Sequence, residues 1–357
     1  MNYALHGRRL APSFLPSAAV LELTYRCNQD CQFCSCPWFA HAPGYDVRPE
    51  LGVGAWKRVI RRLSELGVTS FAFTGGEPLL KEGVHDIIEA AAGCRVSHIE
   101  TRDGGLDCRA GAPALHLLSN GIRVDDRALA LCAHNDVQLS VSLPGLSTFA
   151  RHTGGASADR PLAVLDRARN QGIRTVAGVT VTQQNLFELE ATLEAALGAG
   201  AEGVLLNRFL PGGRGLRFAN QLALSSKQIT AMLDMTESVM VRAGRNASLG
   251  TELPACVVDP DRYEHIAVST RCAAASDFFV VDPSGFLRVC NHSAVRLCHM
   301  DDIAQLKTNA YWRRFAIKSE LPTACVGCAS SSRCDGGCRE AAHIVHGDPL
   351  GADPLLT

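Results

Sequence analysis

The sequence lacks any long hydrophobic run and carries almost no excess of one charge. No stretch of about 20 apolar residues is present, the length that a membrane-spanning helix needs. The first residues are broken by prolines and contain no apolar core of a signal peptide. Lys and Arg number 35 against 36 Asp and Glu, whereas a protein whose main partner is nucleic acid needs a basic excess. We therefore expect a soluble, cytoplasmic protein that binds neither membrane nor nucleic acid.

Cysteine, in contrast, is abundant. The chain of 357 residues contains 15 cysteines, an odd number, and shows no export signal. Structural disulfides are rare in the reducing cytoplasm, so this many thiols more often bind metal. One group of cysteines lies near the N-terminus and another fills the last quarter of the chain.

Between the two cysteine groups, short apolar segments typical of strands alternate with amphipathic ones. The six strand-like segments are 20–25, 70–74, 115–119, 137–143, 174–181 and 203–209. Residues 55–67 read as a helix with Gly67 as its C-cap, and Asn185 with Glu188 resembles a capping box at the start of another. This alternation predicts an α/β fold with a parallel sheet, a partial or full βα-barrel, whose active site lies at the C-terminal ends of the strands.

Composition divides the chain into five parts. From about residue 250 the sequence is dense in cysteine and poor in periodicity, so it needs metal or cross-links to hold it. We predict that 93–113 is an inserted loop or hairpin, to which no function is assigned. The parts are an N-terminal extension (1–19), the barrel (20–215), a linking helical segment (216–250), a cysteine-rich domain (251–340) and a C-terminal tail (341–357).

The first cysteine motif follows the first predicted strand directly. TYRCNQDCQFC places Cys27, Cys31 and Cys34 in one short loop. Three thiolates can hold three irons of a [4Fe–4S] cube and leave the fourth iron open. A tetrahedral zinc site with Cys36 as a further ligand is the alternative, and the spacing alone does not choose between them.

A glycine-rich motif follows the second predicted strand. FAFTGGEPLL places Gly75, Gly76, Glu77 and Pro78 in one turn. Paired glycines let backbone carbonyls approach a ligand closely, and a neighbouring carboxylate suits an ammonium group. Taken alone, the motif is equally typical of an ordinary βα turn.

Together the two motifs resemble the radical S-adenosylmethionine (SAM) superfamily. Its members carry CxxxCxΦC, with an aromatic residue at the position of Phe33, and a GGE motif on the second strand. The resemblance covers residues 20–215 and implies a partial (β/α)6 barrel. It also implies that the open iron chelates the amino and carboxylate groups of SAM, while Gly75, Gly76 and Glu77 hold the ammonium.

Further positions fit the same family. Asn120 in LLSNG follows the third barrel strand, where members carry a similar turn near SAM. Ser142 in VQLSVSLPG occupies the place of a serine that contacts the ribose, although Pro144 stands where Asp is usual and any role of that Asp is in doubt. Arg208, at the end of the sixth strand, is expected to meet the SAM carboxylate or to form a salt bridge.

The second cysteine group has a more specific spacing. Cys325, Cys328, Cys334 and Cys338 form CxxCx5CxxxC, preceded by a cysteine pair around Gly285. The combined pattern resembles the SPASM domain, which usually holds two auxiliary [4Fe–4S] clusters. By position, the resemblance implies one cluster on Cys272, Cys290 and Cys338 and another on Cys325, Cys328 and Cys334.

Each auxiliary cluster needs a fourth ligand. Cys256 is our candidate for the first cluster. For the second, the cysteine that the family carries after Cys338 is missing, which leaves an open iron, a lost cluster or another ligand. The substitutes are His343, His346, Asp348 and Cys298. A zinc knuckle on Cys325, Cys328, Cys334 and Cys338 is the structural alternative. We expect Cys94, Cys108 and Cys132 to be buried apolar residues and Cys36 to form a wall of the SAM site.

The resemblance implies an enzyme that uses SAM and an external electron donor to generate a 5′-deoxyadenosyl radical. Its expected substrate is a ribosomally made precursor peptide, in which it forms a thioether, carbon–carbon or other cross-link or excises backbone. Fewer than twenty residues precede the first strand, so leader binding is expected on the barrel, the cysteine-rich domain or a separate protein. The alternatives are a SPASM dehydrogenase acting on a protein side chain or small molecule, and a non-enzymatic iron–sulfur electron carrier, against which the GGEP turn argues.

Overall fold

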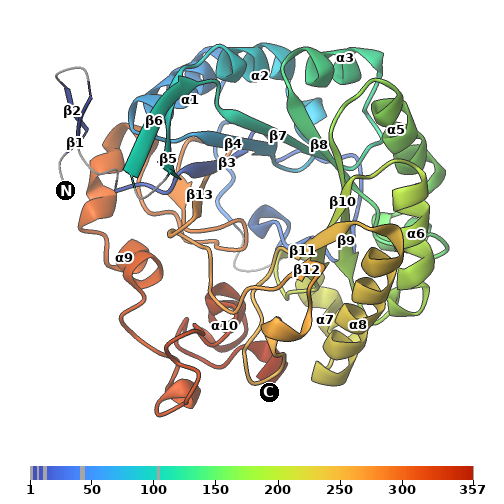
Figure 1. Cartoon of the computed structure of the whole chain (residues 1–357). Coiled ribbons are helices and arrows are strands. Elements are labelled where there is room, and N and C mark those ends of the chain that lie inside the picture. The colour runs from blue at the N-terminus through green and yellow to red at the C-terminus, as the bar shows by residue number, and fades with distance from the viewer. Residues whose placement is uncertain (1–2, 6–7, 11–13, 41–44, 103–104, 357) are drawn as a thin grey trace.

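The computed structural model describes residues 3–5, 8–10, 14–40, 45–102 and 105–356, and its centre is a largely parallel sheet (Figure 1). Six strands run side by side in the order β10-β9-β8-β7-β4-β3, and each neighbouring pair is parallel. They are β3 (Ala18–Glu22), β4 (Ser70–Thr74), β7 (Ala114–Ser119), β8 (Val137–Ser142), β9 (Thr175–Val181) and β10 (Gly203–Arg208). The expected α/β fold with six βα units is confirmed.

The six strands coincide with the six predicted segments to within three residues at each end. Alternate side chains along β9 and β10 are buried, and the others are only partly exposed. This pattern arises because one face of each strand packs under helices while the other lines the inside of the barrel.

Helices cover the outside of this curved sheet (Figure 1). In α1, Trp56, Ile60 and Leu63 are buried on one face, and Gly67 follows the helix at φ +93°, as predicted for its C-cap. The helices of the barrel are α1 (Val53–Glu65), α2 (Val84–Ala92), α3 (Asp126–His134), α4 (Phe149–Thr153), α5 (Asp159–Asn170) and α6 (Leu189–Gly198). Those that follow are α7 (Ala219–Leu222), α8 (Ser226–Ala243), α9 (Ala310–Ile317) and α10 (Arg339–His346).

Strands from the C-terminal part extend the sheet at both edges. The segments β11 (Asn246–Leu249) and β12 (Ile266–Ala267) continue it in parallel beyond β10. At the other edge β13 (Phe278–Val281) pairs in parallel with β3, and β14 (Leu287–Arg288) pairs antiparallel with β13. The C-terminal segments therefore lie between the two edges of the barrel sheet (Figure 1), and the sheet continues across residue 250.

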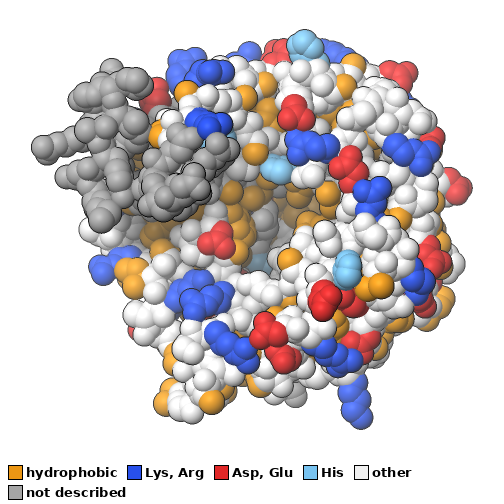
Figure 2. Space-filling model, viewed as in Figure 1, with side chains coloured by type: hydrophobic (Ala, Val, Ile, Leu, Met, Phe, Trp, Pro, Cys, Tyr) orange, Lys and Arg blue, Asp and Glu red, His pale blue; other side chains and the backbone are white. Residues whose placement is uncertain are grey.

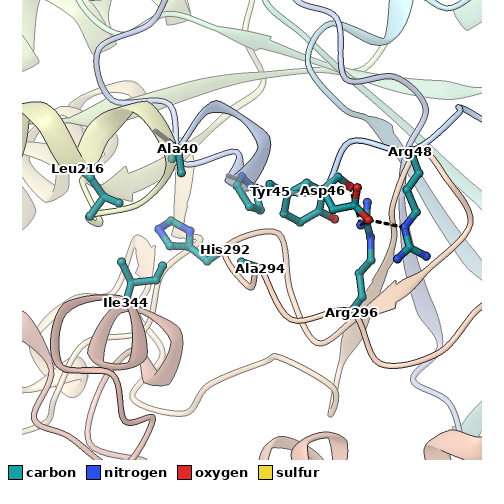
Figure 3. A pocket seen from close by; sticks show the side chains of 11 residues that line it. Ala40, Tyr45, Asp46, Arg48, Leu216, His292, Ala294, Arg296 and Ile344 are labelled. Atoms are coloured by element: carbon teal, nitrogen blue, oxygen red, sulfur yellow. Dashed lines mark hydrogen bonds and ion pairs between the residues drawn. The ribbon is translucent and has the colours of Figure 1, made fainter. Parts of the chain in front are cut away.

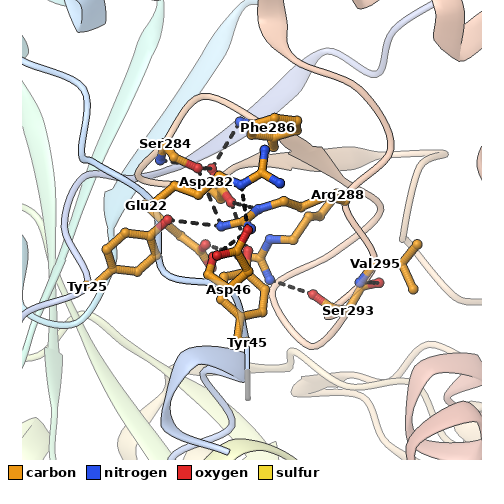
Figure 4. Close-up of polar contacts among 12 residues, drawn as sticks. Glu22, Tyr25, Tyr45, Asp46, Asp282, Ser284, Phe286, Arg288, Ser293 and Val295 are labelled. Atoms are coloured by element: carbon orange, nitrogen blue, oxygen red, sulfur yellow. Dashed lines mark hydrogen bonds and ion pairs between the residues drawn. The ribbon is translucent and has the colours of Figure 1, made fainter. Parts of the chain in front are cut away.

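A polar network fastens the C-terminal part to the start of the barrel (Figure 4). Asp282 accepts hydrogen bonds from Arg296 Nε at 2.6 Å and from the Tyr45 hydroxyl at 2.8 Å. Arg296 also donates to the Tyr25 hydroxyl at 3.1 Å. Beside it, Arg288 and Glu22 form a fully buried ion pair between β14 and β3. These contacts fix the C-terminal part against the strand that precedes the first cysteine motif.

Two short antiparallel hairpins lie outside the main sheet. One consists of β1 (Tyr3–Leu5) and β2 (Arg8–Leu10). The other, β5 (Val96–Arg102) with β6 (Gly105–Gly111), confirms the hairpin predicted within 93–113. Among the helices of the described ranges, none is both long and apolar enough to cross a membrane.

Candidate active site

A cavity of about 450 Å³ lies at the C-terminal ends of the barrel strands. Figure 2 shows that the molecule is hollowed near its middle, with hydrophobic side chains visible inside the hollow. The walls of the cavity come from both halves of the chain. They include the first cysteine motif, the glycine turn after β4, Ser142 at the end of β8, Arg208 at the end of β10, and Cys272, Cys290 and Cys338.

The first cysteine motif forms a loop that α4 holds in place. The N–H groups of Asp30 and Gln32 donate to the carbonyls of Thr153 and His152, at 3.1 and 2.9 Å. Phe33 packs edge to face against the buried His152 ring, with centroids 5.9 Å apart. As a result Cys27, Cys31 and Cys34 all face the cavity, together with Phe33.

The glycine turn touches this loop so closely that side chains are excluded. Gly75 has φ +142°, and a Cβ on it would stand 2.6 Å from the carbonyl oxygen of Thr24. A Cβ on Gly76 would collide with the carbonyl oxygen of Arg26, and the N–H of Glu77 donates to that same oxygen at 2.8 Å. The paired glycines therefore fit the turn against the cysteine loop.

The thiols of the loop sit in a desolvated setting. Burial raises the pKa of Cys27 and Cys31, and a hydrogen bond from Cys36 lowers the pKa of Cys34. Arg214, which donates to the carbonyl of Cys31 at 3.3 Å, places a positive charge beside them. Thiolates that bind iron must lose their protons, and nearby cations favour that loss.

The donor geometry fits a cluster better than a single ion. In the described ranges no three His, Cys, Asp or Glu side chains converge as ligands of one metal ion. In a [4Fe–4S] cube each thiolate binds a different iron, so the sulfurs need not converge on one point. The three thiols of the loop would therefore suit a cube, which they would leave with one iron free of protein ligands.

Glu77 is turned away from the cavity in this structure. Its carboxylate is 1% exposed and accepts hydrogen bonds from the Ser119 hydroxyl and the Asn120 N–H, both at 2.9 Å, and from the Leu79 N–H at 3.2 Å. Burial nevertheless raises the pKa of Glu77. The wall after β4 thus presents Gly75 and Gly76 to the cavity, with Glu77 behind them bracing the turn after β7.

The remaining barrel residues occupy the expected rim. Asn120 lines the cavity and donates to the Asn28 side chain at 2.8 Å, and Ser142 and Pro144 line it at and just after the end of β8. Arg208 also reaches the wall, but its guanidinium is paired with the buried Asp353, at 3.0 and 2.5 Å. Of the two roles expected for Arg208, the structure shows the salt bridge. Pro78 is buried in the turn.

The structure divides the C-terminal cysteines into two sets. The inner set is the three that line the cavity, namely Cys272, Cys290 and Cys338. The outer set, which does not line it, is Cys325, Cys328 and Cys334. Cys338 thus lies at the cavity with Cys272 and Cys290, whereas Cys334, four residues earlier, does not line it.

Cys256 lies beside the outer set, whereas the sequence-based expectation placed it with the inner one. The N–H of Ala255 donates to the Cys334 sulfur at 3.4 Å. Burial is the main cause that raises the pKa of Cys256, and the nearby charges of Cys334 and Cys328 raise it further. The difference arises because the segment after β11 returns past residues 333–335, a contact that linear spacing does not reveal.

The other candidate ligands are engaged elsewhere. Cys298 is buried in the apolar core. The His343 ring lies 2.9 Å from the Tyr311 hydroxyl, and Asp348 accepts the N–H of Leu350 at 2.9 Å. His346 is exposed near the end of α10. Cys132 is buried, as expected, whereas Cys94 and Cys108 are partly exposed.

Comparison with known proteins agrees with this geometry. The model of the Radical SAM superfamily matches residues 21–196. Residues 21–196 of this chain form a radical SAM domain. The matched range begins in β3 and ends in α6, so it contains the first cysteine motif and the glycine turn.

Relatives within the radical SAM superfamily match almost the whole chain. The PqqA peptide cyclase of Xanthomonas campestris pv. campestris is 28% identical over 351 residues, which is 95% of this chain and 86% of the relative. The PqqA peptide cyclase of Rhodopseudomonas palustris is 27% identical over 352 residues, with the same coverage of both chains.

Solved structures share the fold at lower identity. SuiB of Streptococcus suis bound to S-adenosylmethionine superposes with a TM-score of 0.71 at 14% identity, covering 96% of this chain and 77% of SuiB. Native anSMEcpe with bound AdoMet gives 0.70 at 14% identity, covering 95% and 93%. These similarities show the fold of a radical SAM enzyme across the C-terminal part as well as the barrel.

Sequence motifs did not reveal every chemically notable residue of this radical SAM enzyme. Glu252 lines the cavity, and its buried Oε1 atom has no hydrogen-bond partner among the described residues. Glu340 also lines it, and its carboxylate accepts from the Tyr311 hydroxyl at 2.5 Å. Neither belongs to a recognisable motif. The only sequence signal is that Glu340 lies two residues after Cys338 and Glu252 four before Cys256.

A second cavity of about 390 Å³ adjoins the first at His292, which lines both. Figure 3 shows Leu216, His292 and Ile344 at one end of it and Arg48 and Arg296 at the other. Burial lowers the pKa of His292 to about 4, so its ring is neutral at ordinary pH. The side chain shared by the walls of the two cavities, His292, is therefore uncharged.

Proposed function

We propose that this protein is a radical SAM enzyme that modifies a ribosomally made precursor peptide. The observation that carries the proposal is the shared cavity, in which the thiols of the first motif and those of the inner set face one space. A substrate in that space would meet the SAM site and an auxiliary cluster together. The naming of the relatives as PqqA peptide cyclases supports a peptide substrate.

The chain's own residues would hold the cofactors as follows. Cys27, Cys31 and Cys34 bind the [4Fe–4S] cluster, and the backbone of Gly75 and Gly76 borders the SAM amino group, with Ser142 at the ribose. When bound, this pair supplies a 5′-deoxyadenosyl radical that abstracts hydrogen from the substrate. The protein binds and orients both partners and keeps water from the reacting carbon.

The inner and outer sets would hold two auxiliary [4Fe–4S] clusters. The thiols of the inner set are desolvated, since burial raises the pKa of Cys272, Cys290 and Cys338, and iron binding would displace their protons. An external electron donor, a separate leader-binding protein and a cytoplasmic location, where thiols stay reduced, complete the proposal.

The first test is SAM cleavage under anaerobic conditions. The chain reconstituted with iron and sulfide is incubated with SAM and a reductant, and 5′-deoxyadenosine is measured by chromatography. Replacing Cys27, Cys31 and Cys34 by Ala should abolish its formation. Cys132→Ala, which removes a buried thiol of the apolar core, is the matched control and should retain it. No 5′-deoxyadenosine from the unaltered chain would refute the proposal.

The second test identifies the type of product. A candidate precursor peptide is incubated with the active enzyme and analysed by tandem mass spectrometry. Loss of two hydrogens together with missing fragment ions between two residues indicates a cross-link. Loss of two hydrogens confined to one side chain indicates the dehydrogenase alternative, and an unchanged mass with sustained SAM cleavage excludes that peptide as substrate.

A further inference from the structure

The inner and outer sets are separated by the turn at residues 334–338. Cys338 lines the cavity. Cys334 points the other way, where its sulfur accepts the N–H groups of Ala255 at 3.4 Å and Gly336 at 3.3 Å. Two cysteines only four residues apart therefore serve different sites.

Backbone contacts bring Cys256 to the outer side of this turn. The N–H of Leu253 donates to the carbonyl of Ser269, and the N–H of Asp335 donates to the carbonyl of Thr270, both at 3.0 Å. Residues 253–256 thus run beside 269–270, which in turn run beside 333–335. The N–H of Ala255, the residue before Cys256, donates to the Cys334 sulfur at 3.4 Å. Cys325 lies at the same turn, because a Cβ on Gly336 would stand 3.0 Å from its sulfur, and the N–H of Cys328 donates to the Cys325 carbonyl at 3.1 Å. The outer side of the turn therefore carries four neighbouring thiols.

The cavity side holds the three thiols of the inner set and three carboxylates, Glu22, Glu252 and Glu340. Glu22 is paired with Arg288 and accepts a hydrogen bond from the Asn291 side chain at 3.1 Å. Glu340 is already satisfied by the Tyr311 hydroxyl at 2.5 Å, and the His343 ring lies 3.4 Å away. Glu252 differs, because its buried Oε1 has no partner among the described residues. A buried carboxylate oxygen without a partner is costly, and such an atom marks a place where an ion or ligand binds.

We infer that Cys256 closes the outer set as its fourth ligand and that the Glu252 carboxylate supplies the fourth ligand of the inner set. The inference rests on the proposed function in one respect, the presence of two auxiliary clusters. It assigns four thiolates to the outer cluster. The inner cluster, which faces the SAM site, has three thiolates and one oxygen ligand.

The first experiment assigns Cys256 by iron counting. The background is the full chain with Cys27, Cys31 and Cys34 replaced by Ala, which should bind about 8 irons after reconstitution. Adding Cys256→Ala or Cys290→Ala should remove about 4 irons each. Cys298→Ala, a thiol of the apolar core, is the control and should remove none.

Double variants then show which cysteines share a cluster. Cys256→Ala with Cys328→Ala should still remove only about 4 irons, because both act on the outer cluster, whereas Cys256→Ala with Cys290→Ala should remove about 8. The reverse pattern would overturn the assignment. Where a cluster survives on three thiolates, mild oxidation followed by EPR shows which double variant still has one intact cluster, so the assignment remains testable.

The second experiment addresses Glu252 in the same background. Glu252→Ala leaves one iron of the inner cluster without a protein ligand, so mild oxidation should release that iron and give the EPR signal of a three-iron cluster. Glu252→Cys should prevent the loss. Glu340→Gln removes a negative charge from the same cavity and should keep all its iron. Equal iron retention by Glu252→Ala and the background chain would refute the ligand role.

Iron counts and spectra need neither SAM nor peptide, so the two proposals fail separately. A chain that binds the expected iron but forms no 5′-deoxyadenosine contradicts the proposed function and leaves the ligand assignment standing. Activity with the reverse pattern of iron loss contradicts only the assignment.

Discussion

Gly76 shows how one missing side chain positions the candidate SAM site. The turn after β4 approaches the backbone of the cysteine loop so closely that a Cβ at Gly76 would meet Arg26 and Cys27. Both of these neighbours are backbone atoms and neither can rotate aside. The two motifs found in the sequence are therefore the two sides of one packed contact.

Replacing Gly76 by Ala should displace the cysteine loop. We expect a loss of about 1–3 kcal/mol in the free energy of unfolding, typical of overpacking, and reduced iron at the first motif. The measurements are chemical denaturation and iron content after reconstitution. Gly198→Ala is the control, because nothing lies within 4 Å of its Cβ position at the end of α6, and Ala there should be neutral or mildly stabilising. Equal behaviour of the two variants would contradict the packing argument.

The sequence could place these residues but not orient them. Each strand ends where its alternating apolar residues stop, so the motif residues could be assigned to one rim of the barrel. The sequence does not show whether the Glu77 side chain points into the cavity or toward Ser119, because that depends on which loops meet in three dimensions. The same holds for Cys256, whose neighbours at 328 and 334 come from a distant part of the chain.

At the scale of elements, Glu188 joins α6 to the loop after β8. The sequence-based capping box was wrong: no side-chain cap forms, and Asn185 instead donates to the carbonyls of Pro144 and Thr180. Glu188 accepts hydrogen bonds from the N–H groups of residues 146–148 and from the hydroxyls of Ser147 and Thr148. The hydrogen-bond donors of residues 146–148 thus bind the Glu188 carboxylate, so it does not form the capping box that the local sequence predicts.

Glu188 should make stability depend on acid pH. Burial alone would raise the pKa of Glu188, but the hydrogen bonds from Ser147 and Thr148 outweigh it and lower the pKa to about 2 from a usual 4.5. A lowered carboxyl pKa adds stability that is fully present above pH 4.5 and is lost as the pH falls toward 2. Glu188→Gln should therefore lower the free energy of unfolding by about 2–3 kcal/mol at pH 7.

The difference between Glu188→Gln and the unaltered chain should shrink between pH 4.5 and pH 2. Urea denaturation at a series of pH values measures it. Glu65→Gln, which neutralises a surface carboxylate of α1, controls for a general effect of charge. A difference that stayed constant down to pH 2 would show that Glu188 acts through shape rather than through its charge.

At the scale of the whole molecule, the two halves share one sheet and one cavity. The composition change near residue 250 marks where the sequence becomes rich in cysteine. It could not reveal that β11 to β14 extend the barrel sheet, since strands of two to four residues give too weak a pattern. The last residues also return to the barrel, where Asp353 is 1% exposed beneath the cavity wall.

Asp353 links the tail, the inner set and the barrel. Its carboxylate pairs with Arg208 and accepts the Cys338 N–H at 2.6 Å. Burial alone would lower the pKa of Arg208, but Asp353 raises it, so the guanidinium stays charged. Asp353→Asn keeps the shape and leaves that buried charge unpaired, which should cost about 3–5 kcal/mol in the free energy of unfolding.

Urea denaturation of the full chain measures the cost of Asp353→Asn. Replacing both partners, Arg208→Met with Asp353→Leu, should be milder than Asp353→Asn, because no uncompensated charge remains. Glu190→Ala, which removes one acceptor of the exposed Arg242, is the control and should change little. If Asp353→Asn were as harmless as this control, the ion pair would not anchor the tail.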